Sequence, residues 1–128
     1  MRLLLDTHTA IWAVSASDRL PHHIRDIIAE ADESFVSLCS LWEIAVKSAP
    51  GRRYTSPLSL ENAIFEFERT GFQRLDIKLG HLRALAEMPR NHGDPFDRLI
   101  LAQALSEPLR LVTKDRALAE YSDTIISW

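Results

Sequence analysis

Short apolar runs alternate with longer segments of helical periodicity along the whole chain. The run RLLL at residues 2–5 is followed by the helical pattern TAIWAVSA, and SFVSL at residues 34–38 by a second apolar segment with helical spacing. Alternation of this kind is typical of an α/β domain in which helices cover both faces of a mostly parallel sheet. We therefore expect a single domain over residues 1–128, a length sufficient to bury one core.

The expected elements follow from this alternation and from capping and stop signals. A helix is expected to begin at Pro21, where the missing N–H does no harm, and another is expected between the cap Ser59 and the stop signal Gly71. Further strands are predicted at residues 72–77, at residues 109–113 and in the terminal TIISW. Further helices are predicted from Thr7 or Thr9, from Ser40 to Pro50, over residues 79–88 and 96–106, and near residues 115–121.

Composition and charge exclude several classes of protein. The chain is 46% hydrophobic and 26% charged, which is typical of a folded globular protein. Its formal net charge of −3 gives no overall attraction to nucleic acid. The single cysteine, Cys39, lies in an apolar setting and is expected to be a buried, inert thiol. No apolar run approaches the ~20 residues that span a bilayer, so we expect a cytoplasmic protein with no membrane partner.

Acidic residues occur where predicted strands end or the helices after them begin. Asp6 follows the first strand, Glu43 lies early in the helix after the second, and Asp115 follows the strand at 109–113. Asp94 and Asp97 flank the start of the helix at 96–106. In an open α/β sheet these positions face one crevice, where ligands bind. The five acids could therefore converge on one edge of the sheet.

Each of these acids also has a purely structural interpretation. Ser40 and Glu43 have the spacing of a capping box, and Asp94 before Pro95 has the pattern of a helix N-cap. Asp97 would then lie in the first turn, where the helix dipole favours negative charge. Asp115 could cap the helix that follows it, and Asp6 could begin the turn into Thr7. Taken singly, these positions do not distinguish a cap from a ligand.

The acids considered together favour a metal site. A cap contributes only ~1 kcal/mol, and an uncharged serine or threonine would serve as well. Several carboxylates in one cleft repel each other, and a hard divalent cation removes that repulsion. Mg²⁺ and Mn²⁺ take oxygen ligands of this kind. No cysteine or histidine set has the spacing of a zinc site, so zinc is not expected.

Four ordered blocks, LLLDTHTAIW, SLCSLWEIAVK, DPFDRLILAQAL and LRLVTKD, carry a more specific signal than any single acid. In order and spacing they resemble PIN domains, in particular the VapC toxin ribonucleases of bacterial type II toxin–antitoxin modules, over essentially the whole chain. The resemblance implies a three-layer α/β/α fold with a four- or five-stranded parallel sheet. It also implies an endoribonuclease that depends on Mg²⁺ or Mn²⁺, forms a homodimer and is held inactive by a cognate antitoxin.

The resemblance assigns roles to individual residues. Asp6 matches the strand-end aspartate of the family, Glu43 the helix glutamate, Asp97 the aspartate of the D-x-x-I/L-x-A-x-A helix, and Asp115 the acid of the T-x-D block. Asp6 and Asp97 are expected to be the main metal ligands, with Glu43 and Asp115 as further ligands or as groups that orient water. The supporting residues are expected to be Asp94, Thr113 and Thr7.

Two parts of the expected site depart from the full family pattern or rest on weaker signals. Some relatives carry a further acid just after the T-x-D aspartate, but this chain has Arg116 there, which leaves open whether one metal or two bind. RNA contacts are expected from basic side chains near the motifs, namely Arg52, Arg53, Lys47, Lys114 and Arg116.

Trp12 and Trp42 are expected to belong to the core rather than to stack on nucleobases.

Two other classes of function remain as alternatives. A metal-dependent phosphotransfer domain would need D-x-D after the first strand for a haloacid-dehalogenase-like site, but the chain reads Asp6-Thr7-His8. A receiver domain would need a phosphorylatable aspartate after its third strand, where only Asp76 occurs, within the strand pattern. A PIN-like interaction module without catalysis is the other alternative, and the presence of all four matching acids weighs against it.

Overall fold

The computed structural model describes residues 1–50, 56–89 and 93–128 and contains a five-stranded parallel sheet. In the strand order β3-β2-β1-β4-β5, the strands are β1 (Arg2–Leu5), β2 (Glu33–Ser37), β3 (Gln73–Leu75), β4 (Arg110–Thr113) and β5 (Ile126–Ser127). The helices are α1 (Thr7–Val14), α2 (His22–Glu30), α3 (Leu38–Lys47), α4 (Leu60–Thr70), α5 (Leu79–Glu87), α6 (Pro95–Ser106) and α7 (Arg116–Ala119). The predicted α/β class and the parallel sheet are confirmed.

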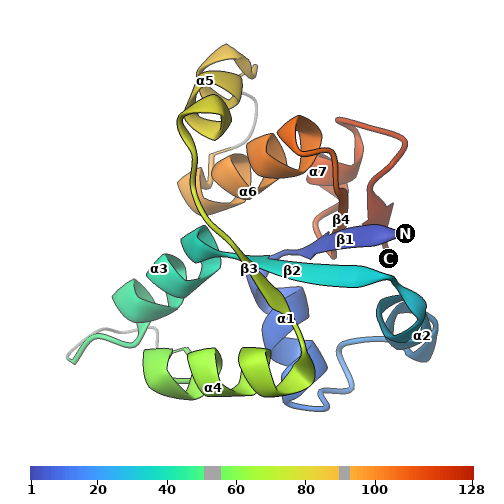
Figure 1. The fold of residues 1–128 in the computed structure, drawn as a ribbon, viewed down its shortest axis with the longest axis vertical. Coiled ribbons are helices and arrows are strands. Elements are labelled where there is room, and N and C mark those ends of the chain that lie inside the picture. Colours follow the sequence, from blue (N-terminus) through green and yellow to red (C-terminus); the bar gives the residue numbers. More distant parts are fainter. Residues whose placement is uncertain (51–55, 90–92) are drawn as a thin grey trace.

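Helices cover both faces of this sheet and give it three layers (Figure 1). Successive side chains of a strand point to opposite faces, so Leu3 and Leu5 of β1 pack with α1, α2 and α4. Leu4 points the other way and packs with α5, α6 and α7. Helix α3 contributes to both clusters, through Ile44 on the first side and Cys39 on the second. It therefore lies across the edge of the sheet, between the two cores.

The strand order reverses direction at β1. From β1 the chain adds β2 and then β3 on one side, and it returns to place β4 and β5 on the other side. Between β1 and β4 the connections leave in opposite directions, and ligands of open α/β sheets bind outside the carboxyl ends of the strands at such a point. Asp6 follows β1, and Thr113 ends β4. The fold therefore places both residues at this switch point.

Several predicted boundaries are corrected by the structure. Helix α3 begins at Leu38, and its N-cap is Ser37, whose hydroxyl accepts a hydrogen bond from the backbone N–H of Cys39. Ser40 is therefore inside the helix, and the predicted capping box of Ser40 and Glu43 is wrong. The helix ends at Lys47 rather than near Pro50, and Pro21 is the N-cap of α2 rather than its first residue. Strand β3 has only three residues because it is an edge strand that pairs with β2 alone.

Gly71 ends α4 in the left-handed conformation, with φ of 91°. A Cβ at this position would meet nothing within 4 Å, so the cost of Gly71→Ala is conformational. We expect this substitution to lower the free energy of unfolding by about 1 kcal/mol. Gly80→Ala is the matched control, because Gly80 lies in α5 with equally open space, and alanine there should raise stability by about 0.5–1 kcal/mol. Urea denaturation measures both, and equal effects would contradict the assigned backbone strain.

No helix within the described part of the chain is both long and apolar enough to cross a membrane.

Candidate metal and nuclease site

Asp6 is a buried carboxylate at the switch point, with 7% of its surface exposed. Its Oδ1 accepts a hydrogen bond of 2.9 Å from the backbone N–H of Thr9, so Asp6 caps α1. Its Oδ2 accepts a bond of 2.5 Å from the Thr113 hydroxyl across the sheet. Burial raises the pKa of Asp6, while these hydrogen bonds and the nearby His8 act in the opposite direction. The carboxylate is thus held in a fixed orientation but is poorly solvated, a setting that favours a cation.

Thr113 connects Asp6 to Asp115, another of the predicted acids. Its hydroxyl donates to Asp6 and accepts a hydrogen bond of 3.0 Å from the backbone N–H of Asp115. Asp115 caps α7, since its Oδ1 accepts a bond of 2.9 Å from the backbone N–H of Ala117. The predicted cap at Asp115 is confirmed. Thr113, which was expected to be a supporting residue, joins Asp6 and Asp115 through these two hydrogen bonds at the end of β4.

Glu43 lies in the middle of α3, and 3% of its surface is exposed. Its Oε2 accepts a hydrogen bond of 2.5 Å from the ammonium of Lys47, which lies one turn later in the helix. Its Oε1 is buried and has no hydrogen-bond partner among the described residues. Burial of a carboxylate oxygen without a partner is costly, so Glu43 is not explained by packing alone.

A small pocket joins Glu43 to the start of α1. Its lining includes Thr7, His8, Ile11, Glu43 and Lys47. The Thr7 hydroxyl donates to the hydroxyl of Ser40 at 2.8 Å, and both residues are buried. This bond fixes α3 against α1 and so sets the position of Glu43 relative to Asp6, which immediately precedes Thr7.

Asp94 and Asp97 begin α6. Asp94 is the N-cap, with Oδ1 accepting hydrogen bonds from the backbone N–H of Phe96 at 2.8 Å and of Asp97 at 3.2 Å, and Pro95 is the first helical residue. The predicted cap is confirmed. Asp97 is half-buried in the first turn, where the helix dipole stabilises its charge.

The starts of α3 and α6 lie against each other. The Cys39 thiol contacts the carbonyl oxygen of Phe96 at 3.6 Å, and the ring of Trp42 packs edge-on against that of Phe96 with centroids 4.7 Å apart. Burial, followed by the charges of Glu43, Asp94 and Asp97, raises the pKa of Cys39 to about 12. The predicted burial of this thiol is confirmed, and a raised pKa is consistent with the low reactivity expected of it.

The acids thus form three local groups at the carboxyl edge of the sheet. Asp6 is linked to Asp115 through Thr113, Glu43 lines the same pocket as Thr7, and Asp94 and Asp97 lie at the start of α6, whose Phe96 carbonyl contacts Cys39 of α3. Within the described ranges, no three acidic, cysteine or histidine side chains are grouped closely enough to hold one ion as they stand. The donors nevertheless suit a hard cation, since all are carboxylate oxygens and the buried Glu43 Oε1 has no partner in the described part of the chain.

The bases predicted to contact RNA fall in different settings. Lys47 is paired with Glu43, and Arg116 is an exposed first residue of α7. Lys114 is exposed, with its ammonium 5.8 Å from the ring centre of Trp12. Arg52 and Arg53 lie outside the described residues.

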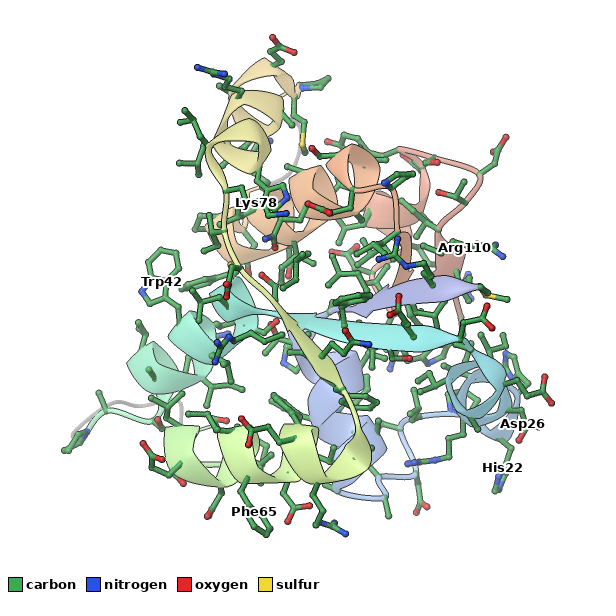
Figure 2. The ribbon with its side chains drawn as sticks, in the orientation of Figure 1. His22, Asp26, Trp42, Phe65, Lys78 and Arg110 are labelled. Carbon is green, nitrogen blue, oxygen red and sulfur yellow. The ribbon has the colours of Figure 1, made fainter. Side chains whose placement is uncertain are left out.

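The two tryptophans differ from each other. Trp12 packs against the core, as predicted. Trp42 was expected to belong to the core as well, but 51% of it is exposed, and it projects from the outer side of α3 (Figure 2). The prediction for Trp42 is wrong because α3 lies at the sheet edge, where only part of its surface is covered.

Comparison with known proteins identifies the class to which this fold and site belong. A family model described as the PIN domain matches residues 3–123, so the chain belongs to the PIN domain family. It is 34% identical over 121 residues to Ribonuclease VapC22 of Mycobacterium tuberculosis, a match that covers 93% of this chain and 91% of that protein. The predicted resemblance to VapC-type PIN domains is confirmed.

Solved structures with the same fold are more distant in sequence. VapBC2 from Rickettsia felis, crystallised with a DNA fragment of its promoter, has a TM-score of 0.69 at 15% identity, covering 100% of this chain and 98% of that chain. DNA-bound VapBC from Salmonella typhimurium has a TM-score of 0.68 at 22% identity, covering 100% and 97%. These matches confirm the predicted three-layer fold.

Proposed function

We propose that this chain is a divalent-metal-dependent endoribonuclease that acts as the toxin of a type II toxin–antitoxin module. Membership of the PIN domain family and the similarity to a VapC ribonuclease support the reaction class. The structural observation that carries the proposal is the buried Glu43, whose Oε1 has no hydrogen-bond partner among the described residues, at the same sheet edge as the poorly solvated Asp6. An oxygen ligand set at a switch point suits phosphodiester hydrolysis far better than a structural role does.

Each acid and each threonine that was predicted for the site has a place in this proposal. Asp6 and Asp97 would hold Mg²⁺ or Mn²⁺, with Glu43 and Asp115 as further ligands or as groups that orient water. A bound divalent ion supplies an activated water and a polarised phosphate. Asp94 would support the site by capping α6, and Thr113 by holding Asp6. Thr7 would fix α3 through Ser40.

The substrate and the protein partners are parts of the same proposal. RNA phosphates would be contacted by Lys114 and Arg116, which are exposed beside the switch point, and by Lys47. A cognate antitoxin is supported by the toxin–antitoxin complexes among the structural neighbours, including one from Klebsiella pneumoniae. Exposed apolar side chains of α3 and α5, namely Leu38, Trp42, Leu79 and Leu82, support a homodimer. The cytoplasm, where RNA and ribosomes lie, is the proposed location.

Cleavage of structured RNA by wild-type protein and by Asp6→Asn tests the proposal. The wild type should cleave with Mg²⁺ or Mn²⁺ and not with EDTA, and Asp6→Asn should lose at least about 100-fold, the upper end of the losses seen for groups that only support a metal ligand. Fragment yields on denaturing gels measure the rates. Equal cleavage by both proteins, with metal and EDTA alike, would refute the nuclease, and binding of partners without cleavage in any condition would favour an inactive PIN-like module.

A further inference from the structure

Lys47 and Glu43 form an ion pair one helical turn apart on α3, with a distance of 2.5 Å between Nζ and Oε2. The two side chains differ in exposure, at 34% for Lys47 and 4% for Glu43. The ammonium therefore reaches from the rim of the pocket to a carboxylate at its base. By contrast, both side chains of the Arg69–Glu66 pair on α4 are much more exposed, at 61% for Arg69 and 26% for Glu66.

Glu43 depends on Lys47 more than a surface acid depends on its partner. A carboxylate taken out of water is strongly destabilised unless a cation or several hydrogen bonds compensate it. In the part of the chain that the structure describes, Lys47 is the one cation paired with Glu43, and Oε1 has no hydrogen-bond partner at all. Of the cations in residues 1–50, 56–89 and 93–128, the Lys47 ammonium is thus the one that compensates this buried charge.

A divalent ion at Glu43 would meet this ammonium on the same carboxylate. Two cations on one carboxylate repel each other, most strongly where water is largely excluded. Resting on the proposed function, we propose that Lys47 is a positioning residue of the metal site: its ammonium balances Glu43 before a divalent ion binds and is displaced when the ion binds. Binding of the ion and the Lys47–Glu43 pair are then antagonistic. The displaced ammonium remains at the pocket rim, free to meet a substrate phosphate.

The sign of the effect of Lys47 on metal affinity tests this inference without any measurement of activity. Titration of the purified protein with Mn²⁺ in a calorimeter gives the affinity, and thermal unfolding in EDTA gives the stability of the metal-free protein. We expect Lys47→Met to bind Mn²⁺ about tenfold more tightly, the order expected when a unit charge beside a divalent ion is removed. In EDTA the same variant should unfold about 5 °C lower, because a buried carboxylate loses its counter-ion.

Three further variants separate charge from packing. Lys47→Arg keeps the positive charge and should behave as the wild type in both measurements. The double variant Glu43→Gln/Lys47→Met removes both charges, so it should recover most of the lost stability and yet bind Mn²⁺ more weakly than the wild type. Arg69→Met breaks a helical ion pair on α4 that is much more exposed than the Lys47–Glu43 pair, and it should leave Mn²⁺ affinity unchanged.

The outcomes distinguish this inference from the proposed function. Unchanged or weaker Mn²⁺ binding by Lys47→Met, with normal binding by the wild type, would overturn the antagonism and leave the metal site standing. Absence of carboxylate-dependent Mn²⁺ binding in the wild type would overturn both. If Lys47→Met does not fold, the double variant decides, since its failure to fold as well would show that Lys47 serves packing rather than charge.

Discussion

Asp97→Asn is expected to lower the rate of metal-dependent RNA cleavage by at least about 100-fold, the upper end of losses for groups that support a metal ligand. The amide keeps the size of the side chain and its place in the first turn of α6. It removes the negative charge that a carboxylate ligand contributes to holding a divalent ion, and a neutral amide oxygen binds such an ion more weakly. Loss of that charge near the helix N-terminus should lower the free energy of unfolding by only about 0.3–1 kcal/mol. Single-turnover cleavage and urea denaturation measure the two effects separately.

Two control variants define what the loss at Asp97 means. Asp26→Asn makes the same chemical change at an exposed acid of α2, which Figure 2 shows at the periphery of the molecule, and should have no effect on cleavage. Asp94→Ser retains a side chain that caps α6 and should lose at most about tenfold. A larger loss at Asp94 than at Asp97 would exchange the roles proposed for the two aspartates.

Gln103→Leu is expected to lower the free energy of unfolding by about 2–4 kcal/mol, because it leaves several buried polar groups without partners. Gln103 is fully buried in α6. Its Oε1 accepts from the Ser37 hydroxyl at 2.5 Å, and its Nε2 donates to the Asp76 carbonyl at 3.3 Å. The same Nε2 lies 3.2 Å from Nδ1 of the buried His81. Leucine would fill the space and satisfy none of these groups.

The network around Gln103 continues to the far end of α6. His81 Nδ1 also accepts from the backbone N–H of Lys78 at 3.0 Å, so its proton is on Nε2, which lies 2.5 Å from Glu107 Oε2 and donates to it. Gln73→Leu is the control, since Gln73 is exposed on the edge strand β3 and should change stability by less than about 0.5 kcal/mol. Urea denaturation at constant pH compares the two variants, and equal effects would show that the buried network stabilises the fold no more than one exposed glutamine does.

The fold could be predicted because the apolar residues show both patterns clearly, short continuous runs for the strands and helical spacing for the helices. The run Leu3-Leu4-Leu5 is apolar throughout because both faces of β1 are covered, as in other parallel sheets. The start of α3 was mispredicted because Ser37 and Ser40 are both plausible caps from local sequence. The choice is made by a distant contact, the bond from Thr7 to Ser40, which no local pattern contains.

The site was harder to separate from ordinary helix capping. Asp6, Asp94 and Asp115 all cap helices, a role that was predicted for Asp94 and Asp115, whereas Asp6 was expected to begin a turn. Capping positions and proposed site positions therefore coincide in this fold. Glu43 differs from these three acids. The structure excludes its predicted part in a capping box, yet its side chain is buried. The spacing of Glu43 and Lys47 is a recognisable helical ion-pair signal, but their burial depends on the docking of α3 against α1.

The hydrogen bond between Asp6 and Thr113 joins residues that are 107 positions apart in the chain. The ribosome therefore makes Asp6, at one side of the proposed metal site, at the start of synthesis, and Thr113, at the other side, more than a hundred codons later. We expect a nascent or prematurely terminated chain that lacks β4 to be harmless to the RNA around it. A cell that makes this protein would thus have the whole time of translation in which to bring an inhibitor to the finished chain.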